Sequence, residues 1–156
     1  MFNLLTERDY DGFVERYLQT DLSEIDPRML PILHEFNKIP GVVSIWCCSG
    51  HTVEEMGGKA PRYQFPYIIF GATKDAEQLF KRFEQWNQTQ SVAQWRQTRA
   101  RLRTSMLTTS PTMDKLNLST TIYPTWELNI RGDFGKDKTG QKTMDLFMML
   151  VKYLQG

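Results

Sequence analysis

Residues 41–51 of the chain read Gly41-Val-Val-Ser-Ile-Trp-Cys-Cys-Ser-Gly-His51, and within them the hydrophobic period shortens to two. This period, bounded by glycines, predicts an apolar strand over about Val42–Cys48 that runs into a turn. The turn contains both cysteines of the chain and one of its two histidines. Reactive side chains therefore concentrate at the end of this strand.

Helical and strand-like segments lie on both sides of this strand. Before it, Thr6 caps a first helix, and Asp26-Pro27 starts a second helix that Pro40-Gly41 ends. After it, the hydrophobic patterns predict a strand over 62–71, a helix after Thr73, a helix from Ser91 to about Arg103, a strand-like segment over 105–113, a strand over 118–131 and a helix from about Thr139. Pro66 cannot donate to a ladder, so it predicts an edge position or a bulge in its strand.

The order of these elements predicts a single α+β domain over residues 1–156. A chain of 156 residues with 40% hydrophobic composition can bury one sizeable core. Strands that follow one another directly favour antiparallel pairing, and the helices around them favour a covering layer. We therefore expect a mixed, mostly antiparallel sheet of about four to five strands packed with about five helices.

Strand alternation assigns side chains to faces. In the first strand, Cys47 would share the face of Val43 and Ile45, and Cys48 the other face, so one thiol is expected in the core. In the strand over 118–131, one face is predicted to be core and the other to be solvent-exposed. The predicted core face holds Ile122, Pro124, Trp126, Leu128 and Ile130, and the predicted solvent face holds Thr121, Tyr123, Thr125, Glu127, Asn129 and Arg131.

Charge and cysteine usage limit the compartment and the partners. The net charge of +1 gives no global field toward nucleic acid or a membrane, so any such binding must come from local charge. Adjacent cysteines cannot join distant segments, which predicts a reduced, cytoplasmic protein. No apolar stretch approaches the roughly 18 residues that a membrane span needs, and the N-terminus lacks the pattern of a signal peptide.

Cys48, Ser49, Gly50 and His51 form the first candidate site. Backbone N–H groups, a hydroxyl and an imidazole at a strand end suit a small anion or a polarised carbonyl. The alternative is structural, because cysteine is commonly buried and Gly50 permits a tight turn. No third group that would orient a catalytic cysteine is visible, and the paired spacings of zinc ligands are missing, so no metal site is predicted.

A basic segment supplies the second candidate site. No acidic residue lies between Gln85 and Met113, whereas Arg96, Arg99, Arg101 and Arg103 lie there beside Trp95. If this segment is helical, Arg99 lies within an apolar stripe and would extend its charged end to solvent, pair with a carboxylate such as Glu127 or bind a phosphate. The alternative is a solvated basic helix face.

Polar residues of two further segments would line the same region. Glu127, Asn129 and Arg131 point the same way from one strand. Lys59 and Arg62 flank a glycine-bearing loop that could close over them. An ordinary solvent-exposed surface remains the alternative.

The helix, the Pro40-Gly41 turn and the apolar strand ending Cys47-Cys-Ser-Gly-His51 resemble one element pair of the wybutosine-synthesis methyltransferase family of tRNA-modifying proteins. That family has a strand ending Ser-Ser-Cys-Ser-Gly-Arg, which matches Cys48, Ser49 and Gly50. Here Cys47 replaces a serine and His51 replaces the arginine, and the family's further motifs are not recognisable downstream. The resemblance covers about twenty residues and implies a strand-and-turn site suited to a nucleotide or an RNA-linked substrate.

These observations favour a small protein that binds a phosphate-bearing ligand, a nucleotide or RNA, at the Cys48–His51 turn. The alternative is a non-enzymatic regulator or inhibitor that binds a protein partner or forms a homo-oligomer. Eight methionines and an aromatic-rich first helix motivate this alternative, because adaptable apolar surface favours partner binding. The sequence predicts neither a cofactor nor a reaction.

Overall fold

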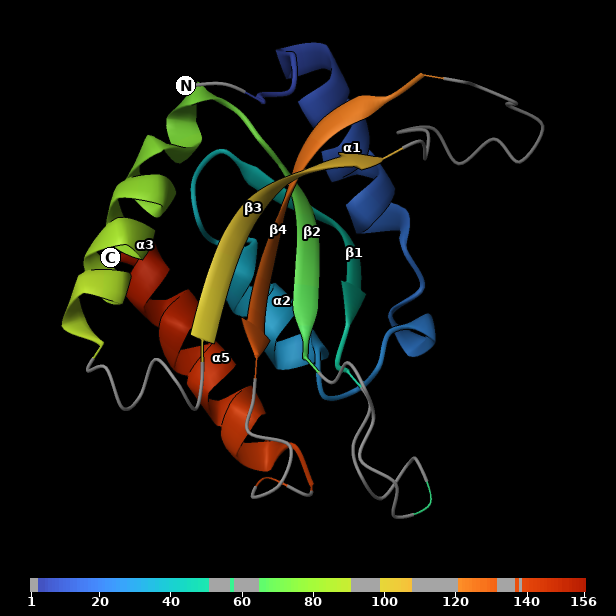
Figure 1. Cartoon of the computed structure of the whole chain (residues 1–156). Helices are drawn as coiled ribbons and strands as arrows, with labels where there is room; N and C mark the ends of the chain where they lie inside the picture. Colours follow the sequence, from blue (N-terminus) through green and yellow to red (C-terminus); the bar gives the residue numbers. More distant parts are fainter. Residues whose placement is uncertain are drawn as a thin grey trace.

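Four strands form one antiparallel sheet in the order β1-β2-β4-β3 (Figure 1). The computed structural model describes residues 3–50, 57, 65–90, 99–107, 121–131, 137 and 139–156. The strands are β1 (Val42–Cys48), β2 (Tyr67–Ala72), β3 (Arg99–Leu107) and β4 (Tyr123–Arg131). The helices in the described part of the chain are α1 (Glu7–Gln19), α2 (Leu30–Phe36), α3 (Glu77–Thr89) and α5 (Gln141–Gln155), with short 3-10 helices η1 (Leu22–Glu24) and η2 (Lys74–Ala76).

The main core lies between one face of the sheet and the helices α2, α3 and α5, which Figure 1 shows together on that side. Phe36 of α2 packs edge-on against Phe70 of β2, with ring centroids 5.0 Å apart. Phe147 of α5 and Leu128 of β4 are fully buried in the same cluster. The predicted α+β fold with an antiparallel sheet is therefore confirmed.

A second, smaller core lies on the opposite face, under α1. Val43 belongs to it while the adjacent Val42 belongs to the main core, as strand alternation requires. Phe13 of α1 is 1% exposed and meets Tyr123 of β4 edge-on at 5.2 Å. Thr6 caps α1 as predicted, because its Oγ1 accepts from the Asp9 N–H at 3.2 Å. Helix α1 therefore covers one end of a face that is otherwise free of the main helical layer.

One face of β4 was predicted to be exposed to solvent, and the structure shows that part of this face is buried. Tyr123, Thr125 and Asn129 are buried, although all three alternate with the residues of the main core. Two of them lie at the end of the strand nearest α1, where the N-terminal segment also reaches β4: the Trp126 Nε1–H donates to the Asn3 carbonyl at 3.0 Å. Alternation assigned the two faces of β4 correctly, but it could not reveal that another element covers part of one of them. Ile122, which was predicted for the core face, lies just before β4 and is 57% exposed.

A bulge in β1 changes the predicted face of Cys47. The register with β2 shifts between Ser44 and Trp46, so that Ile45 is the additional residue. Val43 and Ile45 pack with the second core, whereas Cys47 packs against the main core. The prediction that Cys47 shares their face is wrong, because one inserted residue inverts the alternation beyond it.

The predicted helix ending near Arg103 is wrong over its described part. Residues Arg99–Leu107 form β3, which pairs antiparallel with β4 from Arg99 opposite Arg131 to Leu107 opposite Tyr123. Arginine is a good helix former, so the spacing of its apolar neighbours was compatible with a helix. The alternation of Arg99, Arg101 and Arg103 with smaller or apolar residues fits a strand equally well, and the long ladder with β4 decides between the two.

The position of Pro66 also differs from the predicted one. It lies immediately before β2, which is a central strand between β1 and β4. The missing N–H therefore costs no ladder hydrogen bond, and neither an edge position nor a bulge is needed. In the described residues, no helix combines the length and the hydropathy that crossing a bilayer requires.

Gly41 joins α2 to β1 in a conformation that other residues adopt only with strain. Its φ is +75°, and a Cβ there would lie 2.6 Å from the backbone nitrogen of Ala76. We expect Gly41→Ala to lower the free energy of unfolding by about 2–4 kcal/mol, from the left-handed backbone and from the clash together. Urea denaturation measures this value.

Gly57→Ala is the matched control. Gly57 also has a positive φ of +66°, but no atom lies within 4 Å of its added Cβ. This variant should therefore lose only the conformational part, about 1 kcal/mol. Equal losses in both variants would contradict the close approach of η2 to Gly41.

Candidate functional site

Four arginines share one face of the sheet. In β3, Arg99, Arg101 and Arg103 alternate with Ala100 and Leu102, which pack against the main core. The three arginines therefore point to the opposite face, about 6.8 Å apart along the strand. Arg131 of β4 pairs directly with Arg99 and points the same way. We call this surface, made of Arg99, Arg101, Arg103 and Arg131, the arginine face.

One carboxylate lies among these arginines. Glu127 of β4 accepts from Arg103 Nε at 2.8 Å and from the Asn129 amide at 2.6 Å. Glu127 was one of the partners considered for Arg99 from the sequence, but the register places Arg103 opposite it. Among the described residues of this face, Glu127 meets Arg103, whereas Arg101 and Arg131 add two further positive charges, so the face is locally positive although the whole chain carries only +1.

A hollow of about 120 Å³ opens on the arginine face. It is lined by Phe65, Arg101, Arg103, Asn129 and Arg131. The volume is far below the ~300–1,000 Å³ of common small-molecule pockets and suits a single anionic group. Guanidinium groups and an amide are donors that suit phosphate oxygens. The hollow can therefore hold one phosphate of a larger ligand.

Aromatic side chains continue this face across the sheet. One row of paired residues runs Arg103–Glu127–Ile69–Trp46, and the next runs Arg101–Asn129–Tyr67–Cys48. Trp46 is 54% exposed. Burial raises the pKa of Tyr67, as do the nearby Cys48 and Glu127, so its phenol stays protonated at neutral pH. Arginines at one edge of the sheet and aromatic rings toward the other thus share one surface.

The predicted turn lies at the end of this surface. Cys48 pairs with Tyr67 in the second of these rows, and Gly50 lies against the backbone of Phe65, which lines the hollow. Gly50 has a φ of +78°, and a Cβ there would lie 3.1 Å from the Phe65 carbonyl carbon. The structure therefore brings the turn and the arginine cluster to the same end of the sheet.

Ser49 has a structural role within the turn. Its hydroxyl donates to the Asp26 carboxylate and accepts from an Arg28 guanidinium nitrogen at 2.8 Å. Arg28 also forms an ion pair with Asp26 at 3.1 Å. These contacts tie the end of β1 to the segment that precedes α2. A role of Cys48, Ser49 and Gly50 in ligand binding stays a prediction.

The two thiols differ in surroundings. Cys47 packs against the main core, and burial raises its pKa to about 11. It is therefore a protonated, weakly reactive thiol at neutral pH. Cys48 is half-buried and accepts a weak hydrogen bond from the Gly50 N–H at 3.4 Å.

Three further residues predicted for the site lie outside the described residues: His51, Lys59 and Arg62. Within the part of the chain that the structure describes, no group of three or more histidine, cysteine or acidic side chains is arranged to hold a metal ion.

The sequence pattern placed Arg101 and Arg103 in the basic segment, but only Arg99 of that segment was predicted to bind a ligand, and Trp46, Phe65 and Tyr67 were not predicted for the site. The signal for Arg101 and Arg103 was present, because the period of two over 99–107 places them with Arg99. The aromatic residues carried no such signal, since their contribution depends on which strands are neighbours. Comparisons of the chain with protein-family models, with curated proteins and with solved structures find no match.

Asp26 makes stability depend on pH. Burial alone would raise its pKa, but hydrogen bonds from Arg28 and Ser49 outweigh this effect and lower the pKa from 3.8 to about 2. The carboxylate therefore contributes stability that is complete above about pH 4 and is lost as the pH falls through about 2. Because Asp26 is about one third exposed, we expect a contribution on the order of 1 kcal/mol.

Urea unfolding of the wild type and of Asp26→Asn at several pH values measures this contribution. We expect the variant to be less stable above pH 4 and the difference to shrink toward pH 2. Other carboxylates titrate in both proteins and cancel in the comparison. A difference that stays constant with pH would contradict the charged network around Ser49.

Proposed function

We propose that the arginine face binds the sugar–phosphate backbone of single-stranded RNA. The observation that carries this proposal is the positive hollow between Arg101, Arg103 and Arg131 on an exposed sheet face. Phosphate neutralisation by arginine supplies most of the sequence-independent affinity of nucleic-acid-binding proteins. In this reading the turn predicted from sequence lies at one end of the site, and the arginines of β3 and β4 form its centre.

The sheet surface favours a single strand over a duplex. Alternate residues of β3 lie about 6.8 Å apart, so neighbouring arginines can contact different phosphates of one extended strand. A sheet face cannot read the deep, narrow major groove of duplex RNA, whereas splayed single-stranded bases stack on exposed aromatic side chains.

The ion pair of Glu127 with Arg103 supports the same proposal. It uses the Nε–H of Arg103, which also lines the hollow, and leaves the other N–H donors of the same guanidinium for a ligand. Among the described residues, no ion pair involves Arg101 or Arg131. Their side chains are exposed, so a phosphate would not have to displace a protein carboxylate from them.

The alternative of a regulator that binds a protein partner receives no specific support. The aromatic side chains of α1 that motivated it pack against the second core, and Phe13 is fully buried. Met148 packs against the main core, and Met149 is exposed. The alternative and the cytoplasmic location both stay predictions.

Titration of the full chain with a fluorescently labelled single-stranded RNA tests the proposal. We expect fluorescence anisotropy to show binding at low salt that weakens linearly on a log–log plot as salt increases. A duplex of the same length should compete poorly. Absence of binding at low salt would refute the proposal.

A further inference from the structure

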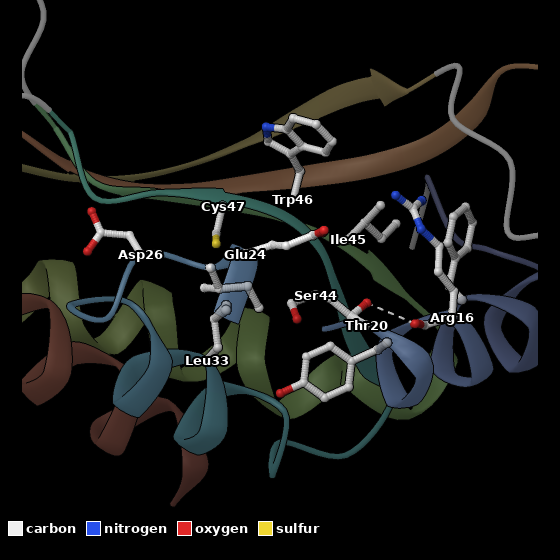
Figure 2. Close-up of a pocket in the computed structure, with 12 residues that line it drawn as sticks. Arg16, Thr20, Glu24, Asp26, Leu33, Ser44, Ile45, Trp46 and Cys47 are labelled. Carbon is white, nitrogen blue, oxygen red and sulfur yellow. Dashed lines mark hydrogen bonds between the residues drawn. The ribbon is translucent and has the colours of Figure 1, made fainter. Parts of the chain in front are cut away.

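A second cavity, of about 300 Å³, lies beside β1 (Figure 2). Its walls come from α1, from the segment between η1 and α2, from Leu33 of α2 and from residues 44–47 of β1. Its volume lies at the lower end of the range for small-molecule sites. Aromatic and aliphatic side chains, including Phe13, Tyr17 and Ile25, form much of the lining. The cavity can therefore enclose one planar, partly apolar group.

The cavity borders the outer side of an edge strand. In the part of the chain that the structure describes, β1 is the first strand of the sheet, so its outer backbone groups have no partner strand there. Nearer the start of β1, side chains fill this role: the Tyr10 hydroxyl donates to the Val42 carbonyl at 3.2 Å, and Asn37 accepts from the Ser44 N–H at 2.9 Å. Beyond Ser44 the cavity itself lies along the strand. A ligand with hydrogen-bonding edges can use the backbone there.

The charge of the lining is nearly balanced. Arg16 stands with Glu24 and Asp26 in the wall, and Asp26 forms an ion pair with Arg28. This contrasts with the three arginines that line the smaller hollow. A phosphate therefore favours the arginine face, whereas the larger cavity suits an uncharged group that both donates and accepts hydrogen bonds.

Trp46 connects the two regions. The residue borders the cavity, but Figure 2 shows its ring on the side of β1 opposite the Cys47 side chain, so the ring belongs to the arginine face. It also ends the row of paired residues that begins at Arg103. Three strand spacings, about 14 Å, separate the backbones of these two residues. A strand of RNA with phosphates at the arginines can thus reach the edge strand β1, which borders the cavity.

We propose that the cavity between α1 and β1 is a binding site for a single nucleobase. The proposal rests on the proposed function for the source of that base, since a strand held on the arginine face would deliver it. Stacking against aromatic walls and hydrogen bonds to the edge of β1 would hold the ring. An uncharged heteroaromatic ring matches the size, the lining and the charge balance of the cavity together.

Two RNA-like strands of equal length test the proposal. One is an oligoribonucleotide, and the other is the abasic sugar–phosphate strand with the same number of phosphates. We expect the strand with bases to bind about tenfold more tightly, because stacking of one base is worth roughly 1–3 kcal/mol. Tyr17→Ala removes an aromatic ring from the cavity wall without changing the arginine face, so it should lower this ratio and leave the affinity for the abasic strand unchanged.

Free nucleosides then locate the site without any phosphate. Methyl-labelled protein is titrated with adenosine, guanosine, cytidine and uridine, and shifts are expected at the cavity methyls of Ile25, Leu33 and Ile45. Leu79 and Leu150, buried among α3 and α5, are the control methyls. Shifts confined to the cavity support the proposal, and nucleosides that leave these three methyls unmoved overturn it.

The outcomes separate this inference from the proposed function. If both strands bind equally and the cavity methyls stay unmoved, the nucleobase site is refuted and the arginine face stands. If neither strand binds but nucleosides shift the cavity methyls, the proposed function is refuted and the nucleobase site stands.

Discussion

Replacing Arg101 and Arg131 with alanine together should weaken single-stranded RNA binding by about 30–100-fold at low salt. Both side chains are exposed, both line the hollow, and they lie on neighbouring strands. A charge-assisted contact with a phosphate contributes about 1.5–3 kcal/mol before losses to solvent screening. The slope of log affinity against log salt should become shallower by about 1.4, because each phosphate contact with a single strand accounts for about 0.7. Anisotropy titrations over a series of salt concentrations give both values.

The control must lose the same charge from another surface. Lys81 of α3 and Lys152 of α5 are exposed on helices of the layer that covers the opposite face of the sheet. Lys81→Ala/Lys152→Ala therefore lowers the net charge by the same two units and should leave the salt slope almost unchanged. A similar loss in both double variants would show that binding follows net charge and would remove the arginine face from the proposal. Unfolding of each variant in urea excludes a difference in stability, which is expected to be small for exposed side chains.

The sequence predicted the fold class because its patterns were locally consistent. Thr6 caps α1, and the apolar face of the helix after Thr73 becomes the buried side of α3. The strand after Gly41 extends over Val42–Cys48 as expected. In each case a start signal and a hydrophobic period agree, so the local signal and the tertiary structure require the same element.

The errors have a different physical origin. The bulge at Ile45 follows from pairing with β2, and no local signal marks it, yet it moves Cys47 from one face of the sheet to the other. The segment Arg99–Leu107 fits two periods, and its pairing with β4 decides for the strand. Both outcomes depend on partners distant in the chain, which a local pattern does not contain.

The sequence predicted which residues belong to the candidate site better than it predicted how these residues are arranged. Glu127, Asn129 and Arg131 do share a face with Arg99, because alternation in β4 and the register with β3 place them together. Ser49 was also predicted for the site, but the structure shows its hydroxyl hydrogen-bonded to Asp26 and Arg28. A hydroxyl in a turn is visible in the sequence, but its partner 23 residues earlier in the chain is visible only in the fold.

Replacing Phe13 with alanine should lower the free energy of unfolding by about 3–5 kcal/mol, the range for large aromatic residues in a core. Phe13 is 1% exposed and is the buried residue through which α1 packs on Tyr123 and the second core. Removing its ring leaves a void between the helix and the sheet that the surrounding side chains fill only in part. Urea or thermal denaturation measures the loss.

Leu18 of α1 provides the matched comparison, because it lies on the same helix and is 76% exposed. Leu18→Ala should change the stability by less than about 0.5 kcal/mol. Phe13→Leu should lose less than Phe13→Ala, because it restores part of the volume and of the apolar area. If Phe13→Ala were as stable as Leu18→Ala, α1 would not be docked on the sheet through Phe13, and the wall that α1 gives to the nucleobase cavity would lose its support.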